Sequence, residues 1–252
     1  MASARTGGGD AARTLRLLWR EPEPRGRRGP RPSLDVDAVV DAAVALADEG
    51  GLEAVSMRAI AKRLGLTAMA VYTYVPGKAE LLDLMLDAVY TAMPRRPWAP
   101  RDAWRARLSA VAGANRDLYG VHPWAARVST ARPPLGPGQL AKYEHELQAL
   151  DGLGLDELEM DAALTHLLGF VQWAAVAAQD AAAAPETDET WWEEAGPLLA
   201  RLADPADYPL ANRVGTAAGE AQGGAFDADR AYAFGLERTL DGLAALIGRS
   251  AT

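Results

Sequence analysis

The sequence of 252 residues contains no cysteine and only three histidines, His122, His145 and His166. The lack of cysteine excludes disulfide scaffolds, thiolate-bound zinc, iron–sulfur clusters and cysteine nucleophiles. Three histidines are too few for a histidine-rich metal centre. The run that begins His145-Glu146 has Ala149 where the HExxH zinc motif needs its second histidine. We therefore expect neither a metal nor another cofactor.

Signatures of catalysis and of membrane insertion are also missing. There are no paired carboxylates, no Ser–His–Asp pattern and no phosphate-binding loop, since Gly7-Gly8-Gly9 does not follow a strand. The uncharged stretch at residues 162–179 approaches the roughly 20 residues that span a bilayer. Its polar residues favour instead a helix buried between other helices. The N-terminus lacks the apolar core of a signal peptide. We expect a cytoplasmic protein that makes no membrane contact and is not an enzyme.

Charge is distributed unevenly along the chain, although the net charge is −8. Residues 1–33 have a net charge of +5, residues 34–98 of −3 and residues 99–252 of −10. Residues 54–79 contain four basic side chains and no acidic one. Such asymmetry indicates a nucleic-acid-facing end on an otherwise acidic protein, with a solvated helix face as the alternative.

Helical periodicity dominates the chain, and no segment alternates convincingly with the period of a strand. Arg, Pro and Gly are too dense in residues 1–33 for a packed element, so we expect a flexible basic arm there, with a short amphipathic turn near residues 15–19 that can dock. Residues 205–224 are expected to be irregular. The class is all-α, with helices expected near residues 36–49, 56–64, 68–74, 78–93, 103–118, 139–150, 156–184, 191–202 and 227–247.

The most informative pattern is the short helix pair within residues 56–75. Ser56 and Thr67 can cap the two helices, and Gly65 supplies the left-handed turn between them. Ala61 is small enough for the helices to approach closely. This spacing is typical of a helix-turn-helix, whose second helix enters the major groove of DNA. The acid-free basic window covers the same residues, so two independent signals agree on DNA binding.

Residues 35–93 resemble the DNA-binding domain of the TetR family of transcriptional regulators. The most specific part of the resemblance is the ending Val71-Tyr72, Tyr74-Val75, Lys78 and Leu81-Leu82. The resemblance implies a helix-turn-helix domain at residues 34–77, a linking helix at residues 78–93, and an effector-binding and dimerisation domain at residues 94–252. It implies that the uncharged helix near residues 162–179 and the last helix form a four-helix bundle across a homodimer axis, although any tight bundle would use the same small residues.

The same resemblance assigns roles to individual residues. The residues expected to contact DNA are Arg58, Thr67, Ala68, Met69, Ala70, Tyr72, Tyr74 and Lys78. Ala68 and Ala70 are too small for bidentate reading of bases, so phosphate contacts and the basic arm would supply much of the affinity. Tyr72 could instead pack inward, and the arm could be a linker instead of a minor-groove contact.

The pocket expected for a small-molecule effector rests on the turn at residues 116–124, which resembles that of tetracycline-type regulators. Its candidate lining is His122, Trp124, Tyr143, His166, Phe170 and Trp173, and an ordinary aromatic core is the alternative. The leading hypothesis is a homodimeric, ligand-responsive repressor that binds a palindromic DNA operator and is released by an effector of unknown identity. The alternatives are an effector-insensitive DNA-binding regulator or activator of the same fold and, in another class, an all-α enzyme.

Overall fold

A computed structural model describes residues 4–21, 35–99, 101–183, 188–222, 224 and 226–250. The described residues form eleven α-helices and one 3-10 helix, without a strand, which confirms the all-α class. In chain order they are α1 (Ala11–Leu18), α2 (Val36–Ala54), α3 (Met57–Leu64), α4 (Ala68–Tyr72), α5 (Lys78–Ala92), α6 (Trp104–Val121), η1 (Pro123–Arg127), α7 (Pro137–Leu147), α8 (Glu157–Ala182), α9 (Asp188–Leu202), α10 (Pro209–Gln222) and α11 (Ala228–Ser250).

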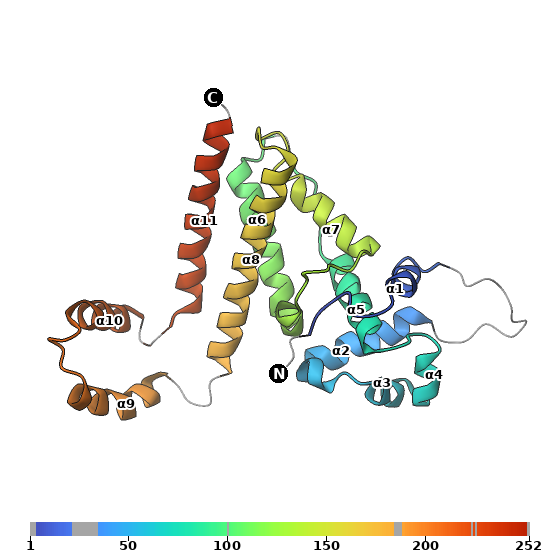
Figure 1. Ribbon diagram of the computed structural model, residues 1–252, viewed down its shortest axis with the longest axis horizontal. Helices are drawn as coiled ribbons and strands as arrows, with labels where there is room; N and C mark the ends of the chain where they lie inside the picture. Colours follow the sequence, from blue (N-terminus) through green and yellow to red (C-terminus); the bar gives the residue numbers. More distant parts are fainter. Residues whose placement is uncertain are drawn as a thin grey trace, which may run out of the picture.

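Helices α2, α3 and α4 form a small head at one end of the molecule (Figure 1). The side chains of Ser56 and Thr67 accept hydrogen bonds from the first turns of α3 and α4, as expected for N-caps. Gly65 ends α3 with φ of 68°, a left-handed conformation that glycine adopts without steric cost. Ile60 and Val71 are fully buried between the helices. The predicted helix-turn-helix geometry is therefore present in the structure.

Helix α5 lies between the head and the larger helical body (Figure 1), packing against α2 on one side and α7 on the other. Three of its carboxylates, those of Glu80, Asp83 and Asp87, are buried. They are stabilised by backbone N–H donors from other segments, because a buried charge needs hydrogen bonds. Asp87 accepts from the N–H of Gln139 at the start of α7, with 2.8 Å between N and Oδ1. Helix α5 thus packs against both the head and the helical body.

Helices α6, α8 and α11 lie side by side in the body (Figure 1). α8 contains the uncharged stretch noted in the sequence, and its Gln172 donates to the carbonyl oxygen of Ala126 in η1 at 2.8 Å. Gln179 of the same stretch donates to the carbonyl oxygen of Pro123 at 3.2 Å, so these two glutamines join α8 to η1. Within the residues that the structure describes, no helix combines the length and apolar content needed to cross a bilayer.

Residues 4–21, which we call the N-terminal strap, are packed against the body. The N–H of Thr6 donates to the carbonyl oxygen of Ser129 at 3.1 Å, and the N–H of Gly7 donates to the carboxylate of Asp83 at 3.0 Å. α1 packs on α5 and buries Leu18. The expectation of a flexible arm is therefore wrong for these residues, because the glycine run lets the backbone approach α5. The other residues of the expected arm lie outside the described ranges.

The second correction concerns α10, which occupies most of the segment that was expected to be irregular. The helix has no buried residue. It therefore lacks the core-facing apolar stripe by which a helix is detected in a sequence. Figure 1 shows α9 and α10 set apart from the bundle of α6, α8 and α11.

Candidate nucleic-acid interface and ligand cavity

The outer face of the head presents polar, apolar and basic groups to solvent. Met69 on α4 is 74% exposed and Tyr72 is 44% exposed, while Thr67 and Arg58 are exposed at the starts of α4 and α3. Tyr72 therefore points outward, and the inward alternative for it is excluded. Tyr74 is half-buried and packs against the core. The short helix α4 thus has an outer side that is accessible to solvent.

The two alanines of α4 contribute differently from the larger side chains. Ala68 and Ala70 are each only partly exposed, and Ala68 packs against the core of the head. Neither side chain carries a hydrogen-bonding group, whereas Thr67 has a hydroxyl group and Met69 a large, exposed apolar side chain.

The basic side chains of the head divide into paired and unpaired ones. Arg63 forms an exposed ion pair with Glu49 on α2. Lys78 donates through Nζ to the carbonyl oxygens of Leu52 and Val55, at 3.0 and 3.1 Å, at the C-terminal end of α2. By contrast, Arg58 and Lys62 are exposed and have no hydrogen bond or ion pair among the described residues. Their charges are available to a polyanion.

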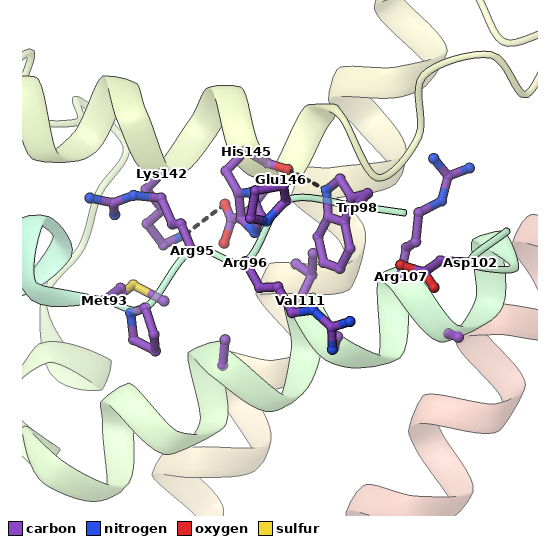
Figure 2. Close-up of a pocket in the computed structure, with 15 residues that line it drawn as sticks. Met93, Arg95, Arg96, Trp98, Asp102, Arg107, Val111, Lys142, His145 and Glu146 are labelled. Carbon is purple, nitrogen blue, oxygen red and sulfur yellow. Dashed lines mark hydrogen bonds and ion pairs between the residues drawn. The ribbon is translucent and has the colours of Figure 1, made fainter. Parts of the chain in front are cut away.

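A cavity of about 300 Å³ lies where the segment after α5 passes between α6 and α7 (Figure 2). Its walls are the chain from Met93 to Trp98, one face of α6 and one face of α7. The indole of Trp98 stacks on the imidazole of His145, with 4.7 Å between ring centroids and 14° between planes. Trp98 Nε1 also donates to the carbonyl oxygen of His145 at 3.1 Å. The orientation of the indole is therefore set by the protein itself.

A buried polar network lies beside this cavity. Lys142 and Glu146 form an ion pair on α7, with 2.8 Å between Nζ and Oε2 and side chains 7% and 4% exposed. Asn115 on α6 donates to the other carboxylate oxygen of Glu146 at 2.6 Å. Burial raises the pKa of the hydroxyl groups of Tyr90 and Tyr119, so both stay protonated at neutral pH. The network joins α5, α6 and α7 around one wall of the cavity.

The six side chains expected from the sequence to line an effector pocket are not brought together. Trp124 Nε1 and His122 Nδ1 each lie 2.8 Å from Oδ1 of Asp48 on α2, so both contact the head. The hydroxyl of Tyr143 donates to Asp161 on α8 at 2.7 Å.

The three residues of the expected pocket that belong to α8 face solvent or contact α11. His166 and Trp173 are exposed, and Phe170 stacks on Tyr232 of α11 with 5.7 Å between ring centroids. The described residues therefore do not gather these six side chains around one cavity, because the tertiary packing directs the helix faces to three different neighbours.

The sequence reasoning missed the residues that do line the cavity. Lys142 and Glu146 are four residues apart, a spacing that ordinarily indicates a solvent-exposed pair on a helix. Trp98 lies in a proline-containing connection that gives no periodic signal. His145 and Glu146 were considered only as part of a zinc motif, which the sequence does not complete. A sequence signal was available in the run Arg95-Arg96 before Trp98, but its meaning depends on α6 and α7 packing beside it.

Comparison with known families gives two matches along the chain. Residues 39–85 match the family described as bacterial regulatory proteins, tetR family. Residues 96–247 match the tetracyclin repressor-like C-terminal domain. The first match contains most of the head and the start of α5, and the second contains most of the cavity lining and the helical body.

Individual relatives agree with these matches. The HTH-type transcriptional repressor DrrR1 of Streptomyces coeruleorubidus is 39% identical over 248 residues, covering 97% of this chain and 89% of DrrR1. Apo ActR from Streptomyces coelicolor has a TM-score of 0.72 at 26% identity, covering 88% of this chain and 100% of ActR. ActR in complex with actinorhodin has a TM-score of 0.71 at 26% identity, with coverages of 84% and 96%.

Proposed function

The chain belongs to the TetR family of transcriptional regulators, and from this membership we propose that it is a homodimeric repressor of a palindromic DNA operator, released by a small-molecule effector. In this proposal residues 34–77 bind DNA, residues 78–93 link the two functions, and residues 94–252 bind the effector and dimerise. It acts in the cytoplasm, where its DNA target lies. The relatives are described as regulators and not as enzymes.

The observation that carries the proposal is the accessible outer side of α3 and α4. Met69 and Tyr72 are exposed there, and the nearby Arg58 and Lys62 have no partner among the described residues. A helix-turn-helix places such a second helix in the major groove, with basic side chains on the flanking phosphates. Thr67, at the N-terminal end of α4, would meet base edges or sugar.

A second copy of the chain supplies the symmetry that a palindromic operator requires. α8 and α11 pack against each other and expose large apolar side chains, among them Trp173 at 58% and Phe234 at 64%. Large exposed apolar groups on neighbouring helices favour association. Burying this face against its symmetry mate would complete a four-helix bundle.

The proposed switch depends on the elements that join the head to the body. α5 begins beside the head, and the chain that follows it lines the cavity from Met93 onward. Asp48 ties α2 to the turn after α6, and the N-terminal strap contacts both α5 and Ser129. An effector that prefers one arrangement of these contacts would change the spacing of the two heads, and by linkage DNA would disfavour that effector equally. ActR, which is similar to this chain along most of its length, has been solved in complex with actinorhodin, and this supports a ligand-responsive role for the chain.

Footprinting of the purified protein on the DNA that flanks its own gene tests the proposal. We expect two protected half-sites with centres separated by about 10 base pairs or a multiple of that spacing. Sedimentation should give a dimer, and Trp173→Glu should shift the protein toward monomer and weaken binding to the two-half-site DNA. Full protection that no small molecule in a broad screen reverses would favour the effector-insensitive alternative. The absence of any selective protection would refute the DNA-binding role.

A further inference from the structure

The cavity lined by residues 93–98, α6 and α7 combines an excess of positive charge with a preformed aromatic wall. We propose that its ligand is a flat aromatic anion, such as an aromatic carboxylate or sulfonate, with its rings along Trp98 and its acidic group on Arg96 and Arg107. This inference rests on the proposed function, because it takes this cavity to be the effector site. It adds the chemical class of the effector.

The charges around the cavity do not balance. Its charged lining consists of Arg95, Arg96, Arg107, Lys142, Asp102 and Glu146. Glu146 is paired with Lys142, and Asp102 accepts the N–H of Ala99 at 2.8 Å. Burial lowers the pKa of His145, so the imidazole is uncharged at neutral pH. The lining therefore has two more positive than negative charges, which attracts an anion and disfavours a cation.

Two of the arginines retain unused donors. Arg107 Nε is buried without a hydrogen-bond partner among the described residues, although Nη1 of the same guanidinium donates to the carbonyl oxygen of Gln148 at 3.3 Å. Arg96 has neither a hydrogen bond nor an ion pair in the described part of the chain. A buried donor without a partner is costly. A ligand that brings acceptor oxygens would satisfy it, whereas a purely apolar ligand would leave it unpaired.

The other walls favour a flat ring system. Trp98 is held by its stacking on His145 and by its hydrogen bond to the carbonyl oxygen of that residue (Figure 2). On the α6 side the lining includes Ala106, Ala110 and Ala114, whose spacing of four residues puts three small side chains on one helix face. Three small side chains on this helix face leave room beside the lining for a flat ring. The cavity volume of about 300 Å³ lies at the lower end of the range for small-molecule sites.

Two fluorescent probes with the same rings test the proposed class. Anilinonaphthalene sulfonate is an aromatic anion with a flat naphthalene ring, and N-phenylnaphthylamine has the same rings without the sulfonate. We expect one sulfonate probe per protomer, bound at least about tenfold more tightly than the neutral probe, a difference of about 1.4 kcal/mol. Equal affinities would overturn the inference, since charge would then add nothing.

Substitutions assign the binding to this cavity. Arg96→Gln and Arg107→Gln should each weaken the sulfonate probe by about tenfold and the neutral probe by less than about twofold. Arg96→Lys should restore most of the binding, because it keeps the charge. Arg116→Gln is the matched control, since this arginine lies on α6 but pairs with Asp229 on α11. Sulfonate binding that resists both glutamine substitutions, or that falls in the Arg116 control, would overturn the inference. Circular dichroism establishes that each variant is folded.

DNA binding by the same preparations separates the two proposals. If the wild-type protein binds its operator but does not distinguish the probes, the ligand class is wrong and the repressor proposal stands. If the arginine-dependent preference for the sulfonate is present and no operator binding is found, the ligand class stands and the repressor proposal is wrong.

Discussion

The packing of α5 on the start of α7 gives a prediction that can be calculated from the structure. Gly138 lies in the first turn of α7 and is buried. A Cβ atom at this position would lie 2.1 Å from the backbone oxygen of Asp87 and 2.9 Å from the backbone nitrogen of Thr91. Backbone atoms inside a helix cannot rotate away, so Gly138→Ala must push α7 off α5.

The cost has two parts. Forcing an extra methyl group into a packed interface costs about 1–3 kcal/mol. Displacing α7 also lengthens the bond from the N–H of Gln139 to the Asp87 carboxylate, and a hydrogen bond to a charged group contributes about 1.5–3 kcal/mol. Because alanine is the better helix former by up to about 1 kcal/mol, we expect a net loss of about 3 kcal/mol. In a chain of this size that lowers Tm by about 6–12 °C.

Urea and thermal unfolding followed by circular dichroism measure this loss, at one fixed protomer concentration because the proposed dimerisation would affect stability. The matched control is Gly113→Ala in the middle of α6, where a Cβ atom would meet nothing within 4 Å. That variant should be more stable than the wild type by about 0.5–1 kcal/mol. If Gly138→Ala is as stable as the control, the close packing of α7 on α5 is not what the structure indicates.

Three further predictions concern the head and its connections. Lys78→Met should weaken DNA binding evenly across sequences. The slope of the logarithm of the DNA-binding constant against the logarithm of the salt concentration should fall in magnitude by about one for each phosphate that the lysine neutralises. An unchanged slope would mean that Lys78 only caps α2. Asp48→Ala should lower the unfolding free energy by about 2 kcal/mol, because it leaves the buried Trp124 Nε1 without its acceptor. If Trp124→Phe lowers the unfolding free energy of the Asp48→Ala variant as much as it lowers that of the wild type, the two side chains do not interact. Burial raises the pKa of Asp83 and Asp87 above 3.8, so the folded state binds more protons than the unfolded chain just above that pH. Wild-type stability should therefore fall relative to Asp87→Asn as the pH rises from about 4 to about 7, and a constant difference in urea unfolding would contradict this.

The head was predictable because its signals are local. Ser56, Gly65 and Thr67 act within one or two turns of their own helices, and the structure uses each of them as the sequence indicates. The outward orientation of Tyr72 was left open, since a five-residue helix is too short for its periodicity to separate the two faces.

The cavity and the N-terminal strap were not predictable, because both are made by interactions between distant parts of the chain. The Gly7-Gly8-Gly9 run is typical of flexible segments, and its role in approaching α5 depends on where Asp83 lies. From the sequence alone, the spacing of Lys142 and Glu146 indicates an ion pair on the surface. In the structure the pair is buried, because α5 and α6 cover it. The resemblance of one turn to tetracycline-type regulators placed the aromatic residues in one pocket, whereas packing separates Trp124 from Trp173.

The most direct test of the central claim, that the outer side of α3 and α4 binds DNA, is the salt dependence of the dissociation constant for the footprinted operator. Fluorescence anisotropy of the wild type and of Thr67→Glu, an exposed substitution at the tip of α4, provides it. We predict a steep linear dependence for the wild type, with a log–log slope of magnitude about 4 or more for two heads that each meet at least two phosphates. Thr67→Glu should bind at least about tenfold more weakly while remaining folded and dimeric. Equal affinity of the two proteins, or a wild-type affinity that does not respond to salt, would contradict the claim.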